Sequence, residues 1–221
     1  MRLITSTERL IHIDVGGVVL EGALGMVEGS VGLVVFAHGS GSSRHSPRNN
    51  HVARTLRDAG LSTLLIDLLT RDEDIDYETR FNISLLSERL VAATYWAGGD
   101  EETRGMNIGY FGASTGAAAA ITASVAMKDR VNAVVSRGGR PDLALDFIPE
   151  VTAPTLLIVG GKDEVVIEFN KKAYGLLRSE KDLVIIPGAT HLFEEPGALD
   201  LVSGYAARWF ARHLGSAVKV A

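Results

Sequence analysis

The sequence predicts an α/β fold with a mostly parallel central sheet and helices on both faces. Two observations favour it: short apolar runs rich in Val, Ile and Leu, and longer amphipathic stretches that alternate with them. The length of 221 residues suits one core, and no repeat, low-complexity tract or linker marks a boundary. We therefore expect one domain over residues 1–221.

The expected elements begin antiparallel and continue parallel. Residues 11–15 and 18–23 flank Gly16 and Gly17, a pattern typical of a hairpin. Buried strands are expected at 33–37, 61–66, 107–111, 131–136, 155–159 and 183–186. Helices are predicted over about 77–96 and 198–213, where apolar residues recur at three- and four-residue spacing.

The stretch between Ser136 and Pro154 has room for a short helix at about 142–147 and for no lid. We therefore expect no cap domain.

Composition excludes several classes of function. A formal net charge of −5 without a basic stripe argues against a nucleic-acid partner. The absence of cysteine rules out disulfides, thiolate zinc ligands and thiol catalysis. No apolar segment has the length of a signal peptide or membrane span, so we expect a cytoplasmic protein without a membrane partner.

A metal site is not expected. No pair of histidines has ligand spacing supported by a carboxylate. The acidic stretch 72–76 lacks the glycine and glutamate that a calcium loop needs, having Tyr77 and Ile83 at those positions. The sequence implies no cofactor.

The strongest chemical signal is the sequence Gly112-Ala113-Ser114-Thr115-Gly116. It follows the predicted strand 107–111 and precedes the alanine run 117–120, which suits a helix packed closely on the sheet. A serine on such a strand–turn–helix junction exposes its hydroxyl, and the flanking glycines permit the close approach. A plain glycine-rich turn is the alternative, but the context favours Ser114 as a nucleophile.

A serine nucleophile needs a base and a group that orients the base. His191 lies in the loop after the strand 183–186, and Asp163 follows the strand 155–159. Glu164 is the alternative acid, and a loop histidine and a surface aspartate are the non-catalytic alternatives. The order Ser, Asp, His is that of the α/β-hydrolase fold.

The loop 38–43 follows the strand 33–37 and is rich in glycine and serine. In an α/β-hydrolase such a loop supplies one backbone N–H of the oxyanion hole, and the residue after the nucleophile supplies the other. Ser40 and Thr115 are therefore the predicted donors, and His38 is expected to fix the loop. A phosphate loop is the rival interpretation, but the Gly-Lys-Ser/Thr ending is missing.

These motifs resemble the α/β-hydrolase superfamily and, within it, the compact, lidless dienelactone-hydrolase-like group. The segments 135–141 and 188–197 also resemble bacterial members found alone or fused to phosphoribosyltransferase domains. Dienelactone hydrolases carry cysteine at the nucleophile position, where this chain has Ser114. The resemblance therefore implies hydrolysis of ordinary carboxylic esters.

The predicted activity is cleavage of small, soluble esters through an acyl-enzyme. A lactone or thioester hydrolase and a non-catalytic binding module are the alternatives, and the sequence leaves open a monomer or a homodimer. Arg137 and Arg140 are candidates for binding a substrate carboxylate, with surface salt bridges as the alternative. Arg44, Arg48 and Asp67 are weaker candidates for the rim of the site.

Overall fold

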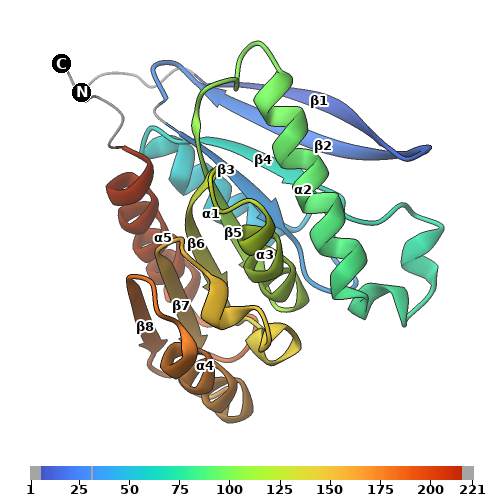
Figure 1. Cartoon of the computed structure of the whole chain (residues 1–221). Helices are drawn as coiled ribbons and strands as arrows, with labels where there is room; N and C mark the ends of the chain where they lie inside the picture. Colours follow the sequence, from blue (N-terminus) through green and yellow to red (C-terminus); the bar gives the residue numbers. More distant parts are fainter. Residues whose placement is uncertain (1–5, 31, 216–221) are drawn as a thin grey trace.

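The computed structural model describes residues 6–30 and 32–215, which form one eight-stranded sheet with helices on both faces (Figure 1). The strand order is β1-β2-β4-β3-β5-β6-β7-β8. The strands are β1 (Ser6–Val15), β2 (Val18–Val27), β3 (Gly32–Ala37), β4 (Ser62–Ile66), β5 (Asn107–Ala113), β6 (Val131–Arg137), β7 (Thr155–Gly160) and β8 (Lys181–Ile186). β2 pairs antiparallel with β1 and β4, and every other pairing is parallel, which confirms the predicted fold class.

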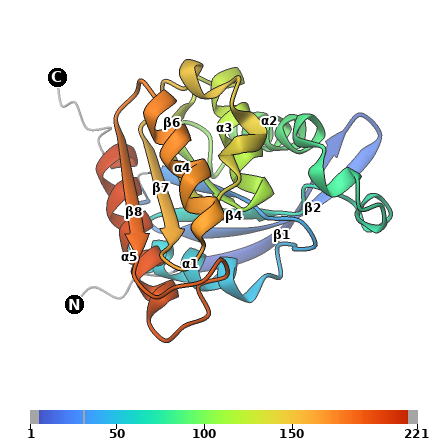
Figure 2. The same cartoon turned by 90° about the horizontal axis from the view of Figure 1, so that it is seen from below.

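Five α-helices of the described residues cover the sheet in two layers (Figures 1 and 2). One face carries α1 (Pro47–Asp58) and α5 (Ala198–Leu214); the other carries α2 (Ile83–Gly99), α3 (Thr115–Ala126) and α4 (Glu164–Leu176). Short 3-10 helices lie in the connections: η1 (Glu73–Ile75), η2 (Thr79–Phe81), η3 (Pro141–Ala144) and η4 (Ile148–Glu150). Within the described ranges, no helix is long and apolar enough to cross a membrane.

The structure differs from the sequence-based expectations at three elements. The helix expected from about residue 77 begins at Ile83, because the Asn82 side chain accepts the Leu85 N–H (3.1 Å) and caps the helix there. In place of the single short helix expected at 142–147, the structure has two 3-10 helices, η3 and η4. The expectation of a buried strand at 183–186 is wrong: β8 is an edge strand, and Ile186 is its one buried residue.

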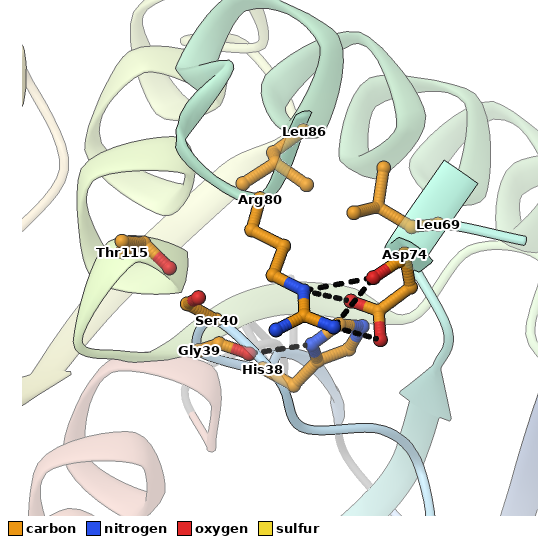
Figure 3. A pocket seen from close by; sticks show the side chains of 8 residues that line it. All are labelled: His38, Gly39, Ser40, Leu69, Asp74, Arg80, Leu86 and Thr115. Atoms are coloured by element: carbon orange, nitrogen blue, oxygen red, sulfur yellow. Dashed lines mark hydrogen bonds and ion pairs between the residues drawn. The ribbon is translucent and has the colours of Figure 1, made fainter. Parts of the chain in front are cut away.

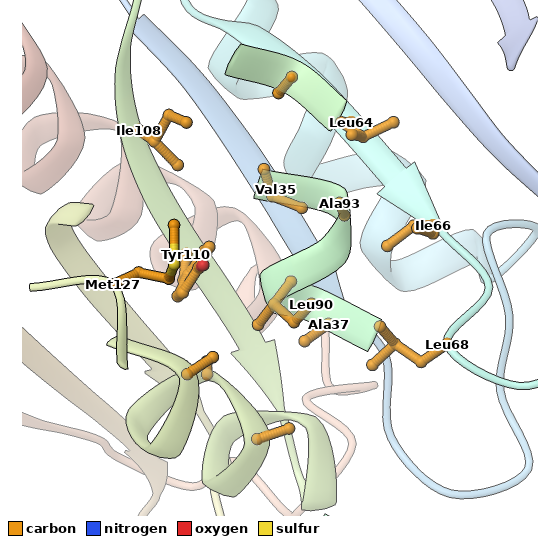
Figure 4. Packing of buried hydrophobic residues seen from close by; sticks show 14 of the residues in the cluster. Val35, Ala37, Leu64, Ile66, Leu68, Leu90, Ala93, Ile108, Tyr110 and Met127 are labelled. Carbon is orange, nitrogen blue, oxygen red and sulfur yellow. The ribbon is translucent and has the colours of Figure 1, made fainter. Parts of the chain in front are cut away.

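The core that supports the site lies on both faces of the strands β3, β4 and β5. Figure 4 shows Leu90 and Ala93 of α2 packed over apolar side chains of these strands. Tyr110 of β5 is fully buried there, and its hydroxyl lies 2.5 Å from Thr94 Oγ1. Each hydroxyl is the hydrogen-bond partner of the other, so neither is left unpaired in the core.

The carboxyl ends of the central strands meet at one edge of the sheet. The register pairs Ala37 with Gly112, Ala113 with Arg137, and Arg137 with Ile158. In a parallel sheet this edge is where the loops that bind ligands gather. The segments after β3, β5, β6, β7 and β8 therefore share one side of the molecule.

Candidate active site

Ser114 stands between β5 and α3 in a strained backbone conformation. Its φ of 52° and ψ of −120° lie in a region that residues with a side chain rarely adopt. The turn is fixed from two sides, because Ser114 N–H donates to the Arg137 carbonyl (3.2 Å) and its own carbonyl accepts from the Arg140 N–H (3.1 Å). The predicted sharp turn is present, and it points the serine outward from the edge of the sheet.

The two glycines of the motif have a steric reason. A Cβ on Gly112 would lie 2.4 Å from Ala117 Cα, and a Cβ on Gly116 would lie 2.2 Å from the Ala37 carbonyl oxygen. Both contacts are with backbone, which cannot move aside as a flexible side chain can. The start of α3 therefore packs on β3 and β5 only when these positions are glycine.

His191 and Asp163 meet across two loops. His191 Nδ1 lies 2.6 Å from Asp163 Oδ2, with the histidine side chain 37% exposed and the aspartate 16% exposed. A carboxylate on Nδ1 selects the tautomer with its proton there, which leaves Nε2 free to accept a proton. The contact is made by Asp163, whereas Glu164 is the exposed first residue of α4.

The loop that carries His191 is tied down on both sides of the histidine. The Thr190 N–H donates to the Glu195 carboxylate (3.0 and 3.1 Å), a bond that lowers the pKa of Glu195. Arg48 Nη1 donates to Glu194 Oε1 (3.0 Å), which joins the loop to α1. These bonds hold the backbone from which the imidazole projects.

Gly138 shows how close His191 lies to the Ser114 turn. A Cβ on Gly138 would sit 3.1 Å from the His191 carbonyl oxygen and 3.5 Å from His191 Cε1. Gly138 directly follows Arg137, the residue whose carbonyl accepts the Ser114 N–H. The structure thus brings the imidazole to the same edge as Ser114.

The Ser114 hydroxyl is not engaged elsewhere. In the part of the chain that the structure describes, Ser114 Oγ forms no hydrogen bond, and the residue is partly exposed. Hydrogen bonds between a nucleophile and its base are often long without substrate. The arrangement therefore leaves Ser114 available to a base.

The loop after β3 lies against Ser114. A Cβ on Gly39 would be 3.1 Å from Ser114 Cβ. Gly39, Ser40 and Thr115 line a small cavity with room for about one water molecule, roughly 10 Å³ (Figure 3). Within the described residues the N–H groups of Ser40 and Thr115 donate no hydrogen bond, as expected for Thr115 at the first position of α3. Two residues of the cavity lining thus have backbone N–H groups without a hydrogen-bond acceptor.

His38 holds this loop in place. Its Nε2 accepts the Leu68 N–H (3.0 Å), and its Nδ1 lies 3.0 Å from the Gly39 carbonyl oxygen. Burial lowers the pKa of His38, so the ring is neutral and can serve as acceptor and donor at once. This agrees with the structural role expected for His38.

The sequence did not indicate that Asp74 and Arg80 also line the cavity. Both lie between β4 and α2, Asp74 in the acidic stretch 72–76 and Arg80 within the helix predicted from about residue 77. Arg80 Nε donates to the Asp74 carbonyl (2.9 Å), and Figure 3 shows the guanidinium over the 38–40 loop. The helical pattern predicted from about residue 77 gives no signal for a site, so the sequence did not indicate their place at the cavity.

Several predicted rim residues are engaged by other protein groups. Arg140 makes two hydrogen bonds to Asp142 (2.8 and 2.7 Å), which raise the pKa of Arg140, and it lies over the Phe169 ring. Arg44 pairs with Asp67 and with Glu21. Arg137, by contrast, is buried, and its Nε and Nη1 have no hydrogen-bond partner. Among the described residues, no three His, Asp or Glu side chains gather as a metal site.

Comparison with known proteins gives the family. The family model described as "Dienelactone hydrolase family" matches residues 22–214. A crystal structure of dienelactone hydrolase from Anabaena variabilis shares 54% identity, covers 95% of this chain and 99% of its own, and superposes with a TM-score of 0.92. Est1E from Butyrivibrio proteoclasticus, at 18% identity, covers 93% of this chain and 99% of its own with a TM-score of 0.78, a likeness of fold.

Curated relatives in two Mycobacterium tuberculosis strains bear the name "Putative phosphoribosyl transferase" and are 51% identical over 204 residues. The match covers 92% of this chain but 46% of theirs, so the chain spans about half their length. The family model, the sequence identity and the fold agree over the matched residues. The chain belongs to the dienelactone hydrolase family and has the α/β-hydrolase fold.

Proposed function

We propose that this chain is a serine hydrolase that cleaves small carboxylic esters through an acyl-enzyme intermediate. The observation that carries the proposal is the 2.6 Å contact between His191 Nδ1 and Asp163 Oδ2, at the same edge of the sheet as the strained Ser114. Ser114 is the proposed nucleophile, His191 the general base and Asp163 the group that orients the imidazole.

The proposed reaction proceeds in two halves. His191 Nε2 takes the proton of Ser114 Oγ as the serine attacks the ester carbonyl, and then gives that proton to the leaving alcohol. Water, activated by the same imidazole, hydrolyses the acyl-serine and restores Ser114. The N–H groups of Ser40 and Thr115 are the proposed donors to the tetrahedral oxyanion, and each such donor is worth about 3 kcal/mol.

The open architecture favours small substrates. The segment between β6 and β7 contains the two turns η3 and η4 and no cap, and the cavity beside Ser40 and Thr115 is small. A long acyl chain would find little apolar surface to bury there. We therefore favour short-chain, soluble esters.

The chemistry of the leaving group is a separate question. Lactones and thioesters are attacked by the same nucleophile and need the same oxyanion donors, so they are the second candidate substrates. The family name points to a lactone, whereas the serine at position 114 in place of cysteine favours oxygen esters. A fold retained for binding alone is the third candidate.

The transferase name of the mycobacterial relatives is not carried over to this chain. It describes proteins of about twice the matched length, and 46% of their residues correspond to the segment described here. The roles proposed for Ser114, His191 and Asp163 are those of acyl transfer to water.

The proposal is tested by steady-state turnover of p-nitrophenyl esters of increasing acyl length, with a lactone and a thioester in parallel. We expect the highest kcat/KM for short oxygen esters, and loss of turnover in Ser114→Ala and His191→Ala. Equal turnover by folded Ser114→Ala would overturn the assignment of the nucleophile. A steep preference for long acyl chains would contradict the open site.

A further inference from the structure

A deeply buried arginine without a partner lies beside the site. Arg137, the last residue of β6, is 7% exposed, and its Nε and Nη1 are buried without a hydrogen-bond partner. Its third nitrogen, Nη2, forms no hydrogen bond either and is not among these buried atoms, so it reaches solvent. Both bidentate faces of this guanidinium are therefore unoccupied.

Arg48, a second positively charged side chain, lies near Arg137. Burial, together with repulsion from Arg48, lowers the pKa of Arg137 to about 10, so the group stays charged at neutral pH. Arg48 has its own buried and unpartnered atom, Nε, while its Nη1 is held by Glu194. Buried charges are normally paired, since an unpaired one is costly to desolvate.

Other arginines of the chain follow that rule. Arg89 is as buried as Arg137, and it donates to Glu73 at 2.9 Å. Arg140, three residues beyond Arg137, is bonded twice to Asp142. The protein thus supplies carboxylates to its other sheltered guanidinium groups and leaves Arg137 with none.

The position of Arg137 in β6 shows which elements surround its unoccupied N–H groups. Side chains alternate along a strand, so Arg137 projects from the same face as Ala133 and Val135. Those residues pack in one cluster with Val52 of α1 and Phe193 of the histidine loop. The guanidinium therefore lies on the face that α1 and the histidine loop cover, and Arg48, in the first turn of α1, is near enough for its charge to act on Arg137.

We propose that Arg137 and Arg48 form a binding site for the oxyanion group of a small anion, a carboxylate or a phosphate, beneath the His191 loop. An arginine presents parallel N–H groups that match two oxygens of such a group. The anion would replace the missing counter-charge and brace the loop through Arg48 and Glu194. It is either a substituent of the ester substrate or a separate small anion.

The binding claim is tested apart from catalysis, in the Ser114→Ala background. The unfolding midpoint is measured against rising inorganic phosphate, and separately acetate, with ionic strength held constant by sodium chloride. Arg137→Met fills similar volume without the charge, and burying methionine there is expected to preserve the fold. Arg54→Gln, an exposed position on α1, is the matched control.

In the Ser114→Ala protein, the parent of this series, we expect the unfolding midpoint to rise and saturate with added anion. Adding Arg54→Gln should leave that rise unchanged. Arg48→Gln and Arg137→Lys should weaken it, and Arg137→Met should abolish it. No saturable rise in the parent with either anion would overturn the site. So would an equal rise in Arg137→Met.

The source of the anion is decided with active protein, and this arm rests on the proposed esterase function. Turnover of mono-4-nitrophenyl succinate, an anionic ester, is compared with that of neutral 4-nitrophenyl butyrate. If the substrate carries the anion, Arg137→Met lowers kcat/KM for the succinate by about tenfold and leaves the butyrate unchanged, the effect of losing one charge-assisted hydrogen bond.

If a separate anion occupies the site, Arg137→Met affects both esters alike while phosphate binding still requires Arg137. Both results support the site and distinguish its ligand. If no ester is turned over, the proposed function fails, and the unfolding midpoints still decide whether the anion site exists.

Discussion

The Ser114 turn and the His191 loop meet at one edge of the sheet but are held there by different forces. Around Ser114, backbone packs against backbone: Gly116 lies so close to Ala37 that a methyl group would overlap its carbonyl oxygen. Around His191, side-chain contacts of Asp163, Glu195 and Arg48 add to a close backbone approach at Gly160, where a Cβ would lie 2.5 Å from the Thr190 carbonyl oxygen. The Ser114 turn thus depends mainly on close backbone packing, whereas the orientation of the His191 imidazole depends on side-chain contacts.

This difference predicts how each region responds to change. An atom added at a close backbone contact must displace α3 from β3, and this displacement disturbs the packing of the core. Polar contacts can be removed singly, so each removal alters the orientation of the imidazole and leaves the fold intact. Mutations at the turn should therefore appear in stability, and mutations at the loop in kcat.

The largest effect is expected from Asp163→Asn. The amide would present an N–H₂ group or a weaker acceptor to Nδ1, which favours the wrong tautomer of His191 and removes the charge that stabilises its protonated form. We expect kcat for short esters to fall about 10⁴-fold, equivalent to about 5 kcal/mol, with an unchanged unfolding midpoint. Glu164→Gln is the control, and a larger loss of kcat in Glu164→Gln than in Asp163→Asn would assign the acid to Glu164.

Next in size is Gly116→Ala. Because the new methyl group would meet the Ala37 and His38 carbonyl oxygens at 2.2 and 2.4 Å, α3 must shift from the sheet. We expect a loss of about 3 kcal/mol in the free energy of unfolding, measured in urea. Gly175→Ala, in α4 with no atom within 4 Å of the added Cβ, should instead stabilise by about 0.5 kcal/mol. Equal effects at the two positions would show that packing at the turn is looser than described.

A smaller effect is expected from Glu195→Ala. The Thr190 N–H loses its acceptor next to His191, so the imidazole is held less well while the core is untouched. We expect kcat to fall by roughly tenfold or less, with a thermal midpoint close to that of wild type. Glu101→Ala, at an exposed position in the α2–β5 connection, should change neither quantity. A loss of stability with unchanged kcat would mean that Glu195 supports the fold and not the base.

The smallest expected effect is a loss of stability at acid pH that arises from His38, in the loop after β3. Burial lowers the pKa of His38 below its usual value of 6.5, so the unfolded chain binds more protons than the folded one below that pH. Stability should therefore fall as pH decreases through about 6.5 toward the lowered pKa. His38→Gln, which keeps an acceptor for Leu68 N–H, should lose less stability between about pH 7.5 and pH 5.5, measured by urea unfolding. The exposed His45→Gln should retain the wild-type pH dependence.

The same difference explains what the sequence could predict. The Gly112–Ser114–Gly116 spacing is a local consequence of steric fit, so the turn and its flanking strand and helix were visible in the sequence. Asp163 and His191 were predicted as partners from their positions after strands and their order, and the structure joins the two side chains by a hydrogen bond.

Other features depend on contacts between segments distant in sequence. Arg80 lies within the helix predicted from about residue 77, but the structure places it in a turn before α2 and at the cavity. The missing counter-charge of Arg137 emerges only when β6, α1 and the histidine loop are assembled. The edge position of β8 follows from strand order, which its apolar sequence does not encode.

Covalent reactivity at Ser114 is the most direct test of the central claim. Intact-mass measurement after treatment with a fluorophosphonate probe should show one adduct per chain in the wild-type protein and none in folded Ser114→Ala. Equal labelling of the two proteins would place the nucleophile elsewhere. No labelling of folded wild-type protein would contradict the serine-hydrolase account and favour a binding role for this fold.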